Sequence, residues 1–424
     1  MMVLHRRVRV CVVVLAVCVV ALLSQSCGSA GAGGSSSDNG GGSSVTLTPR
    51  PTSTPRTSPS LQPSGTRTRT PTSPPVTQPG QKGTATPTPT EVPPTEVPTA
   101  TPAIVTVFAG QSIAAAARNV PDGGIVVVAP GTYRAVVLNP GDLQGSVTLF
   151  ADVTGDFTNS SAAAVTIVAG SNDVAAFTAI GQSGLDIDGF TLRGGSNAGF
   201  LCVDCSGVTI LDATVSGSGG DAVHLEGSDS VLVFNNLLIG NKGAGVRALG
   251  TTNLEVINNT IYKNTTAGIV LSRSGGNAST AAFLRNNILN KNTPTGIVVD
   301  PGPPSSLDGF DADFDLNTDG YSGNTAGAND SAADPLFIFP SGGDFHLAFG
   351  SQAIDSGTDA IGSDLVGELQ LLTTQTDGTL DTSLPDRGYH FVAPIPTPTR
   401  VPKVTRTPTP TVRNTSTPTR TRTP

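Results

Sequence analysis

The side chains with the clearest potential for chemistry lie between residues 204 and 247. Strand alternation turns His224 and Glu226 outward, because the apolar residues beside them point inward. Arg247 follows His224 at an interval at which many other positions of the chain recur, so the two side chains are expected to be neighbours. Asp204 lies one residue out of register with Glu226 on the preceding repeat. These four residues are the candidate catalytic cluster.

The cluster offers two kinds of polysaccharide chemistry. A lyase would use His224 or Arg247 to remove the proton beside a uronate carboxyl group, while the other residue neutralises that carboxylate. A glycoside hydrolase would use Asp204 and Glu226 as its carboxylate pair. The alternative is a solvated surface patch without catalytic function.

The polar patch is short. Leu201, Val270 and Val298 occupy the same outward column as His224 and Arg247 on the flanking repeats. A groove that grips a chain polymer should extend over more repeats, which favours the surface-patch interpretation.

A second candidate site lies in the segment 308–324. Asp315, Asn317 and Asp319, followed by a glycine, match the first half of a Ca²⁺-binding loop, D-x-N-x-D-G. The twelfth position, where a bidentate glutamate belongs, is Ala326. The alternative is a strand whose apolar residues alternate with acids on the wet face.

Two cysteines lie in the candidate folded region. Cys202 and Cys205 are too few for a four-ligand zinc site. They form either a local disulfide, if the chain turns between them, or two unpaired, partly buried thiols.

The elements that position these residues follow a repeat. Several columns of similar residues share the same successive spacings, which are 23, 23, 23 and then 28. Two of these columns are aliphatic: Ile187, Ile210, Val233, Val256 and Leu284; and Leu192, Val215, Leu238, Ile261 and Leu289. The longer last interval is expected to place its additional residues in a loop near residues 272–280.

Each repeat contains three short apolar runs separated by Gly/Asn turns, as in EVINN, TIYKN and AGIVL. Three strands in about 23 residues can coil into a parallel β-helix in which each rung pairs with the next. The sequence therefore predicts an all-β, right-handed parallel β-helix with disordered Thr/Pro-rich flanks.

Asparagines recur at the same interval and are expected to stack as side-chain amide ladders. Asparagine also tolerates the left-handed conformation of a tight turn. The three columns are Asn235, Asn258 and Asn286; Asn236, Asn259 and Asn287; and Asn241, Asn264 and Asn292. We interpret them as structural.

The two ends of this region resemble known families. The stretch 110–138 begins with a short amphipathic helix expected to cap the open end, and its motif GQSI…DGGIVVVAPGTYR is similar to the entry of pectin-lyase-like parallel β-helix proteins. DPLFIFPSGGDFHLAFGSQAIDSG with DRGY resembles the closing module of bacterial surface proteins in the choice-of-anchor Q group, although Tyr389 and His390 depart from its usual ending. The resemblance covers residues 104–391 and implies the fold, since the superfamily contains both enzymes and non-enzymatic surface proteins.

The flanks indicate export. Residues 1–26 are expected to be a signal peptide. LSQSC resembles a bacterial lipobox ending in Cys27, which predicts a lipid anchor; plain secretion is the alternative. Residues 27–103, first Gly/Ser-rich and then Thr/Pro-rich, and the basic Thr/Pro-rich tail 394–424 are expected to be disordered. The β-helix domain is assigned to 104–393, with the closing module from about 334.

Charge limits the partners. Residues 104–393 carry ten basic and 29 acidic side chains, which argues against nucleic-acid binding. We expect a monomer at the cell surface that binds a polysaccharide or cell-surface glycan without catalysis. It is expected to contact the membrane only through its anchor, and Ca²⁺ is its one candidate cofactor. The alternative functions are a polysaccharide lyase or glycoside hydrolase, and a purely structural envelope component with a Ca²⁺-stabilised cap.

Overall fold

The computed structural model describes residues 101–273, 282–300 and 310–393. The predicted signal peptide, Cys27, all but the last three residues of the predicted linker, and the tail 394–424 lie outside the described residues. So does most of the loop expected at residues 272–280. Within the described part of the chain, no helix is long and apolar enough to cross a membrane.

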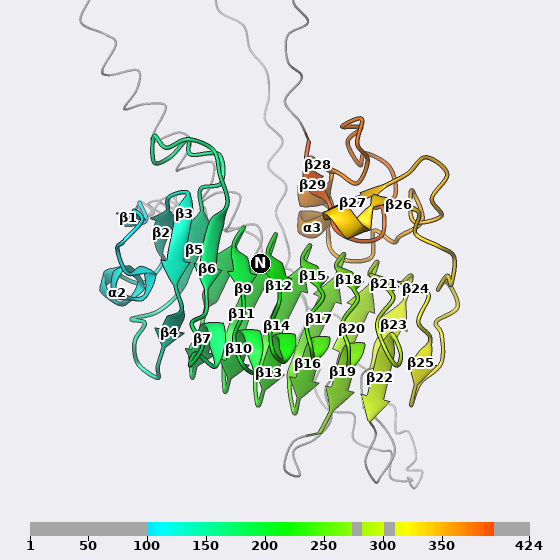
Figure 1. Ribbon diagram of the computed structural model, residues 1–424, viewed down its shortest axis with the longest axis horizontal. Coiled ribbons are helices and arrows are strands. Elements are labelled where there is room, and N and C mark those ends of the chain that lie inside the picture. The colour runs from blue at the N-terminus through cyan, green and yellow to red at the C-terminus, as the bar shows by residue number, and fades with distance from the viewer. Residues whose placement is uncertain (1–100, 274–281, 301–309, 394–424) are drawn as a thin grey trace, which may run out of the picture. The chain divides into compact units, whose positions relative to one another are not determined.

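Three parallel sheets surround one core (Figure 1). Sheet I contains β1 (Ile104–Val107), β2 (Gly124–Val128), β5 (Val147–Ala151), β8 (Leu185–Asp188), β11 (Ser206–Leu211), β14 (Asp229–Phe234), β17 (Thr252–Ile257), β20 (Ala282–Arg285) and β23 (Asp311–Asp313). Sheet II contains β4 (Val136–Leu138), β7 (Ala175–Ile180), β10 (Ala198–Val203), β13 (Asp221–Glu226), β16 (Ala244–Leu249), β19 (Ala267–Ser272), β22 (Ile297–Asp300) and β25 (Tyr321–Ser322). Sheet III contains β3 (Gly131–Arg134), β6 (Val165–Val168), β9 (Thr191–Arg193), β12 (Thr214–Ser216), β15 (Leu237–Ile239), β18 (Thr260–Tyr262), β21 (Ile288–Asn290) and β24 (Leu316–Asn317).

The register of these sheets confirms the predicted repeat. Val233 of β14 lies opposite Val256 of β17, and Val256 lies opposite Leu284 of β20. These are consecutive members of one predicted aliphatic column, and the longer last interval is kept in the register. Successive turns of the chain therefore stack strand on strand, and the predicted right-handed parallel β-helix is confirmed.

The inward columns form the hydrophobic core. The ten aliphatic side chains of the two columns predicted from the sequence are all fully buried. Burying a side chain of this size stabilises the fold by about 1.5–3 kcal/mol. Because each rung contributes to one continuous core, the stack depends on contact between neighbouring rungs.

A short helix covers the first rung, as expected. Helix α2 (Ile113–Asn119) starts at Ser112, whose Oγ accepts a hydrogen bond from the backbone N–H of Ala115. Its buried face packs on the β-helix core. The helix thus shields apolar side chains that have no preceding rung.

Two asparagine columns run through the interior as amide ladders. They are Asn236, Asn259 and Asn287; and Asn241, Asn264 and Asn292. Within each column, Oδ1 accepts hydrogen bonds from the backbone N–H and the Nδ2 of the asparagine on the preceding rung, with Nδ2 to Oδ1 distances of 3.0 Å. Each Nδ2 also donates to a backbone carbonyl, as Asn259 does to Val233. The buried amides are therefore satisfied by one another and by the turns they hold.

Both ladders end on an aspartate. Asn287 donates through its backbone N–H and Nδ2 to Asp315 Oδ1, at 2.8 and 3.0 Å. Asn292 donates in the same way to Asp319 Oδ2, at 2.8 and 2.9 Å. The last residue of a ladder must accept hydrogen bonds but has no further asparagine to donate to, so a carboxylate suits this position.

The third asparagine column differs from the prediction. Asn235, Asn258 and Asn286 have the expected left-handed conformation, with φ between 53° and 59°. Asn286 Nδ2 donates to Asn258 Oδ1, but the remaining bonds of this column run mainly to the segment after residue 353. Asn258, for example, donates to the carbonyl of Asp386 at 2.8 Å. These side chains lie on the outside of the turn, so they dock a second segment instead of forming a complete ladder.

We use the name closing module for residues 334–393. It contains β26 (Phe337–Phe339), the 3-10 turn η1 (Pro340–Gly342), β27 (Asp344–Leu347), α3 (Ser363–Leu369), β28 (Leu372–Thr373) and β29 (Phe391–Val392). Figure 1 shows it beside the later rungs, next to the strands of sheet III.

The closing module packs on two of the three sheets. Leu365 and Leu369 of α3 join a buried cluster with Phe234 and Ile257 of sheet I. Phe345 of β27 joins Leu237 and Tyr262 of sheet III in another cluster. The asparagine turn lies between these two sheets, so the module is held by apolar contacts on both sides of its polar attachment.

Replacement of a central ladder residue tests this account. We expect Asn259→Ala to lower the free energy of unfolding by about 3 kcal/mol or more, because it removes partners of Asn236, Asn287 and the Val233 carbonyl in the buried interior. Urea unfolding followed by circular dichroism would measure the change. Asn139→Ala, at an exposed asparagine, is the control and should change stability by less than about 0.5 kcal/mol. Equal effects of the two substitutions would contradict the ladder's role.

Candidate functional site

Two adjacent strands of sheet II position the candidate catalytic residues. In β13, Val223 and Leu225 are buried in the core, so His224 lies on the outer face. Arg247 of β16 is directly opposite His224 in the register. The structure therefore places these two side chains on neighbouring strands, as the repeat predicts.

An aspartate that the sequence analysis missed joins them. Asp221 Oδ2 accepts hydrogen bonds from His224 Nδ1 and from Arg247 Nε, both at 2.8 Å. Its other oxygen, Oδ1, accepts from the backbone N–H of Ala244 at 2.6 Å. Asp221 is thus the centre of an Asp–His–Arg cluster.

The environment keeps Asp221 ionised. Burial alone would raise the pKa of its carboxyl group, but hydrogen bonds from His224 and Ala244 and the charge and hydrogen bond of Arg247 outweigh burial and hold that pKa below its ordinary value. A buried carboxylate with these three donors fixes the positions of both the His224 and the Arg247 side chains.

Small residues make room for this carboxylate. A Cβ atom on Gly243 would lie 2.3 Å from Asp221 Oδ1. A side chain at position 243 would therefore displace Asp221, so the glycine is a steric requirement of the cluster.

The other two predicted residues lie apart from the cluster. Asp204 is exposed in a turn with a φ of 52°, and its backbone N–H donates to the Glu226 carbonyl at 2.8 Å. Among the described residues, no hydrogen bond or ion pair joins the Asp204 or Glu226 carboxylates to His224 or Arg247.

The turn at Asp204 brings Cys202 and Cys205 together, and their sulfur atoms form a buried disulfide with Cα atoms 6.1 Å apart.

A hollow of about 470 Å³ begins at Arg247 and continues over the later rungs of sheet II. We call it the sheet II hollow; its lining includes Arg247, Val270, Val298, Asp300 and Ser322. His224, on the rung before Arg247, is outside this lining, and 8% of its surface is exposed. The cluster thus presents its arginine, and not its histidine, to the hollow.

The predicted Ca²⁺ loop has a different set of contacts. Asp315 and Asp319 are the terminal acceptors of the asparagine ladders, and Asn317 donates to the carbonyl of Gly320 at 2.9 Å. The alternative interpretation, with acids on the wet face, is wrong for Asp315, which is fully buried. These contacts give each of the three residues a structural role, and Ca²⁺ binding at this segment stays a prediction.

Asp315 is a titratable group inside the core. Burial, and after it the negative charge of Asp330, raises the pKa of Asp315 to about 7. Its Oδ2 is buried without a hydrogen-bond partner. The folded protein therefore holds a proton on this carboxyl group at pH values where the unfolded chain has lost it.

A family model agrees with the sheet topology. The family model described as "Right handed beta helix region" matches residues 157–320 and ends before the closing module. Pectate lyase Pel9A aligns at 12% identity with a TM-score of 0.35, over 68% of this chain and 96% of that chain. The match to the periplasmic alginate epimerase AlgG has 15% identity and a TM-score of 0.28, over 42% of this chain and 44% of that chain, so it spans less than half of the epimerase. The AlgE6 A-module of Azotobacter vinelandii mannuronan C-5 epimerase aligns at 16% identity with a TM-score of 0.32, over 45% of this chain and 69% of that chain. No curated protein matches.

The cluster can be tested through stability. We expect Asp221→Ala to lower the free energy of unfolding by about 3 kcal/mol, because the His224 and Arg247 side chains and the Ala244 N–H lose a buried acceptor. Thermal unfolding of Asp221→Ala and Glu226→Ala would measure it, with Glu226→Ala expected to stay close to the wild type. A larger loss in Glu226→Ala would show that the centre of the cluster is misassigned.

The buried Asp315 predicts a pH effect. Because its folded pKa lies above the unfolded value of 3.8, the stability it contributes is complete below about pH 4 and is lost as the pH rises towards 7. Relative to Asp315→Asn, which cannot ionise, the wild type should lose up to about 1.4 kcal/mol per pH unit across this range. Melting temperatures between pH 4 and pH 8 would measure the difference. The exposed control Asp156→Asn should follow the wild type, and parallel curves for the wild type and Asp315→Asn would refute the prediction.

Proposed function

We propose that this protein is a carbohydrate-binding protein of the cell envelope that holds a glycan in the sheet II hollow without chemical turnover. The observation that supports this proposal is the hollow itself, which joins a fixed arginine to an aliphatic floor at Val270 and Val298. Its volume lies within the range of about 300–1,000 Å³ that is usual for small-ligand sites.

The lining suits a sugar. The C–H face of a pyranose ring can pack on Val270 and Val298, while its hydroxyl groups can bond to Arg247, Asp300 and Ser322. Arg247 is already oriented through its Nε, so its terminal nitrogens bind a ligand at a low entropic cost.

The position of His224 favours binding over catalysis. A general base must come within hydrogen-bonding distance of the proton it removes. His224 lies outside the lining of the hollow. A ligand seated over Val270 and Val298 therefore has Arg247, but not the imidazole, within reach.

One observation favours a catalytic alternative. Asp221 holds Nδ1 of His224, and no hydrogen bond among the described residues engages its Nε2. An imidazole oriented by a carboxylate, next to an arginine, is an arrangement that proton abstraction beside a uronate carboxylate requires. This would make the protein a polysaccharide lyase.

We further propose that the protein is exported and attached by a lipid at Cys27, with the linker 27–103 separating the β-helix from the membrane. This part of the proposal is supported by the order of basic, apolar and small residues before Cys27 and by the Thr/Pro-rich composition of the linker. A monomeric β-helix would leave the sheet II hollow open to a glycan.

A glycan screen tests the binding function. We expect the full-length protein to bind at least one polysaccharide in a panel of neutral and acidic glycans, and Arg247→Ala to weaken that binding at least tenfold, as measured by calorimetry. Arg193→Ala, at an exposed arginine of sheet III, is the matched control and should bind as the wild type does.

The same reactions would be followed for unsaturated products and new reducing ends. Turnover that is lost in His224→Ala would replace the binding function with the lyase function. Absence of binding to every glycan, or binding unaffected by Arg247→Ala, would refute the proposed site.

A further inference from the structure

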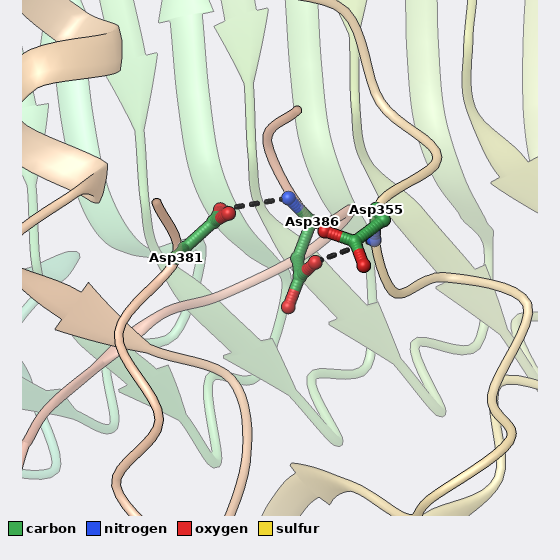
Figure 2. A group of neighbouring side chains, drawn as sticks. All are labelled: Asp355, Asp381 and Asp386. Atoms are coloured by element: carbon green, nitrogen blue, oxygen red, sulfur yellow. Dashed lines mark hydrogen bonds between the residues drawn. The ribbon is translucent and has the colours of Figure 1, made fainter. Parts of the chain in front are cut away.

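Three carboxylates converge inside the closing module, away from the sheet II hollow. Asp355, Asp381 and Asp386 each place one oxygen within 4.8 Å of the others. Figure 2 shows Asp386 between the other two, with the Asp381 carboxylate directed towards it. Asp381 and Asp386 are buried, at 6% and 3% exposure, whereas Asp355 is exposed.

The cluster contains more negative charge than its surroundings neutralise. Among the described residues, the one histidine, lysine or arginine side chain bonded to it is His390, whose Nε2 is 2.8 Å from Asp381 Oδ2. Arg387 is close in the chain but donates to the carbonyls of Ser356, Asp315 and Asn329. Burial, in the first place, and the negative charge of Asp381 raise the pKa of Asp386. Holding these buried carboxylates next to one another in their ionised form is therefore unfavourable.

An unsatisfied oxygen points to what the cluster lacks. Asp386 accepts hydrogen bonds at both oxygens, from the Asp355 N–H and from Thr374 Oγ1. Asp381 Oδ2 accepts from His390 and from the Asp386 N–H. Asp381 Oδ1, however, is buried without a hydrogen-bond partner, and its side chain is only 2% exposed. A buried carboxylate oxygen without a donor is costly unless a cation lies against it.

We propose that Asp355, Asp381 and Asp386 bind one Ca²⁺ ion. Carboxylate oxygens are the ligands that Ca²⁺ prefers, at about 2.3–2.6 Å, and two ligands on opposite sides of such an ion are about 4.8 Å apart. Zinc is a poorer match, because its sites usually include cysteine or histidine. The exposed side at Asp355 leaves space for the water ligands that complete the coordination.

The ion has a structural role. It joins the segment at Asp355 to the segment 381–390, which contains the groups that attach the module to the β-helix. Asn258 donates to the Asp386 carbonyl, and Asn235 donates to the His390 carbonyl and accepts from the His390 N–H. His390 also holds Asp381 through its imidazole, so it is a positioning residue for the ion. Ca²⁺ therefore stabilises the attachment of the module to the asparagine turn.

Calcium titration of the full-length protein tests this proposal. After dialysis against EDTA, calorimetry should show one Ca²⁺ bound per chain, and Ca²⁺ should raise the melting temperature. Asp355→Asn, a change at an exposed ligand that leaves the core intact, should weaken binding at least tenfold, and Asp381→Asn should weaken it further. Asp359→Asn, at an exposed aspartate close to Asp355 in the chain, should bind as the wild type does.

Three results would overturn the proposal. The first is no heat of binding and no change in melting temperature at millimolar Ca²⁺. The second is unchanged affinity in Asp355→Asn, a variant expected to fold. The third is binding that is lost in Asp319→Asn but retained in Asp355→Asn, which would move the ion to the D-x-N-x-D-G segment. Native mass spectrometry of each variant would count the bound ions independently.

Discussion

The constraint on which this structure depends is the satisfaction of buried backbone groups at the turns of the β-helix. Each turn between sheets I and III exposes N–H and carbonyl groups to an apolar interior, where water cannot reach them. The amides of Asn236, Asn259 and Asn287 satisfy these groups and one another, because an amide both donates and accepts. The ladder requires a constant register from rung to rung, and this requirement fixes which side chains face the core and which face outward.

The ends of the ladders show the same logic. At the start of the ladders, the side-chain oxygens of Asn236 and Asn241 accept hydrogen bonds from the backbone N–H groups of Ala213 and Ser218, which are not asparagines. The last rungs present Asp315 and Asp319, which only need to accept. The outer turn column follows another rule: Asn235, Asn258 and Asn286 share the left-handed conformation, but their amides face the closing module. One residue type thus serves the interior and the docking surface at adjacent positions.

The sequence predicted what depends on periodicity. The aliphatic columns, the parallel register and the asparagine ladders all follow from residues spaced by one repeat. The roles of Asp315 and Asp319 were missed because a familiar local pattern suggested an ion, although Asp315 follows Asn287 at the same interval at which Asn287 follows Asn259. Asp221 carried no such signal, because the residues one repeat before and after it are Ala198 and Ala244. Its hydrogen bonds to His224 on the same strand and to Arg247 on the next rung depend on how far these side chains extend. Asp355, Asp381 and Asp386 are brought together by the fold of the closing module, which has no repeat from which to predict it.

The position of the closing module also determines where a ligand can bind. Its apolar clusters cover parts of sheet I and sheet III, and none of the hydrogen bonds or apolar clusters of the described residues joins it to sheet II. The module therefore leaves the outer face of sheet II uncontacted, and the aliphatic strip there consists of Val270, which is 7% exposed, and the partly buried Val298. On that face, Arg247 is held by a buried carboxylate, Asp221. In the proposed function, Asp221 fixes the site and Arg247 contacts the ligand. A rigid solenoid with a sheet that the closing module does not contact suits the proposed binding, because the inter-rung hydrogen bonds, and not the ligand, hold these side chains in place.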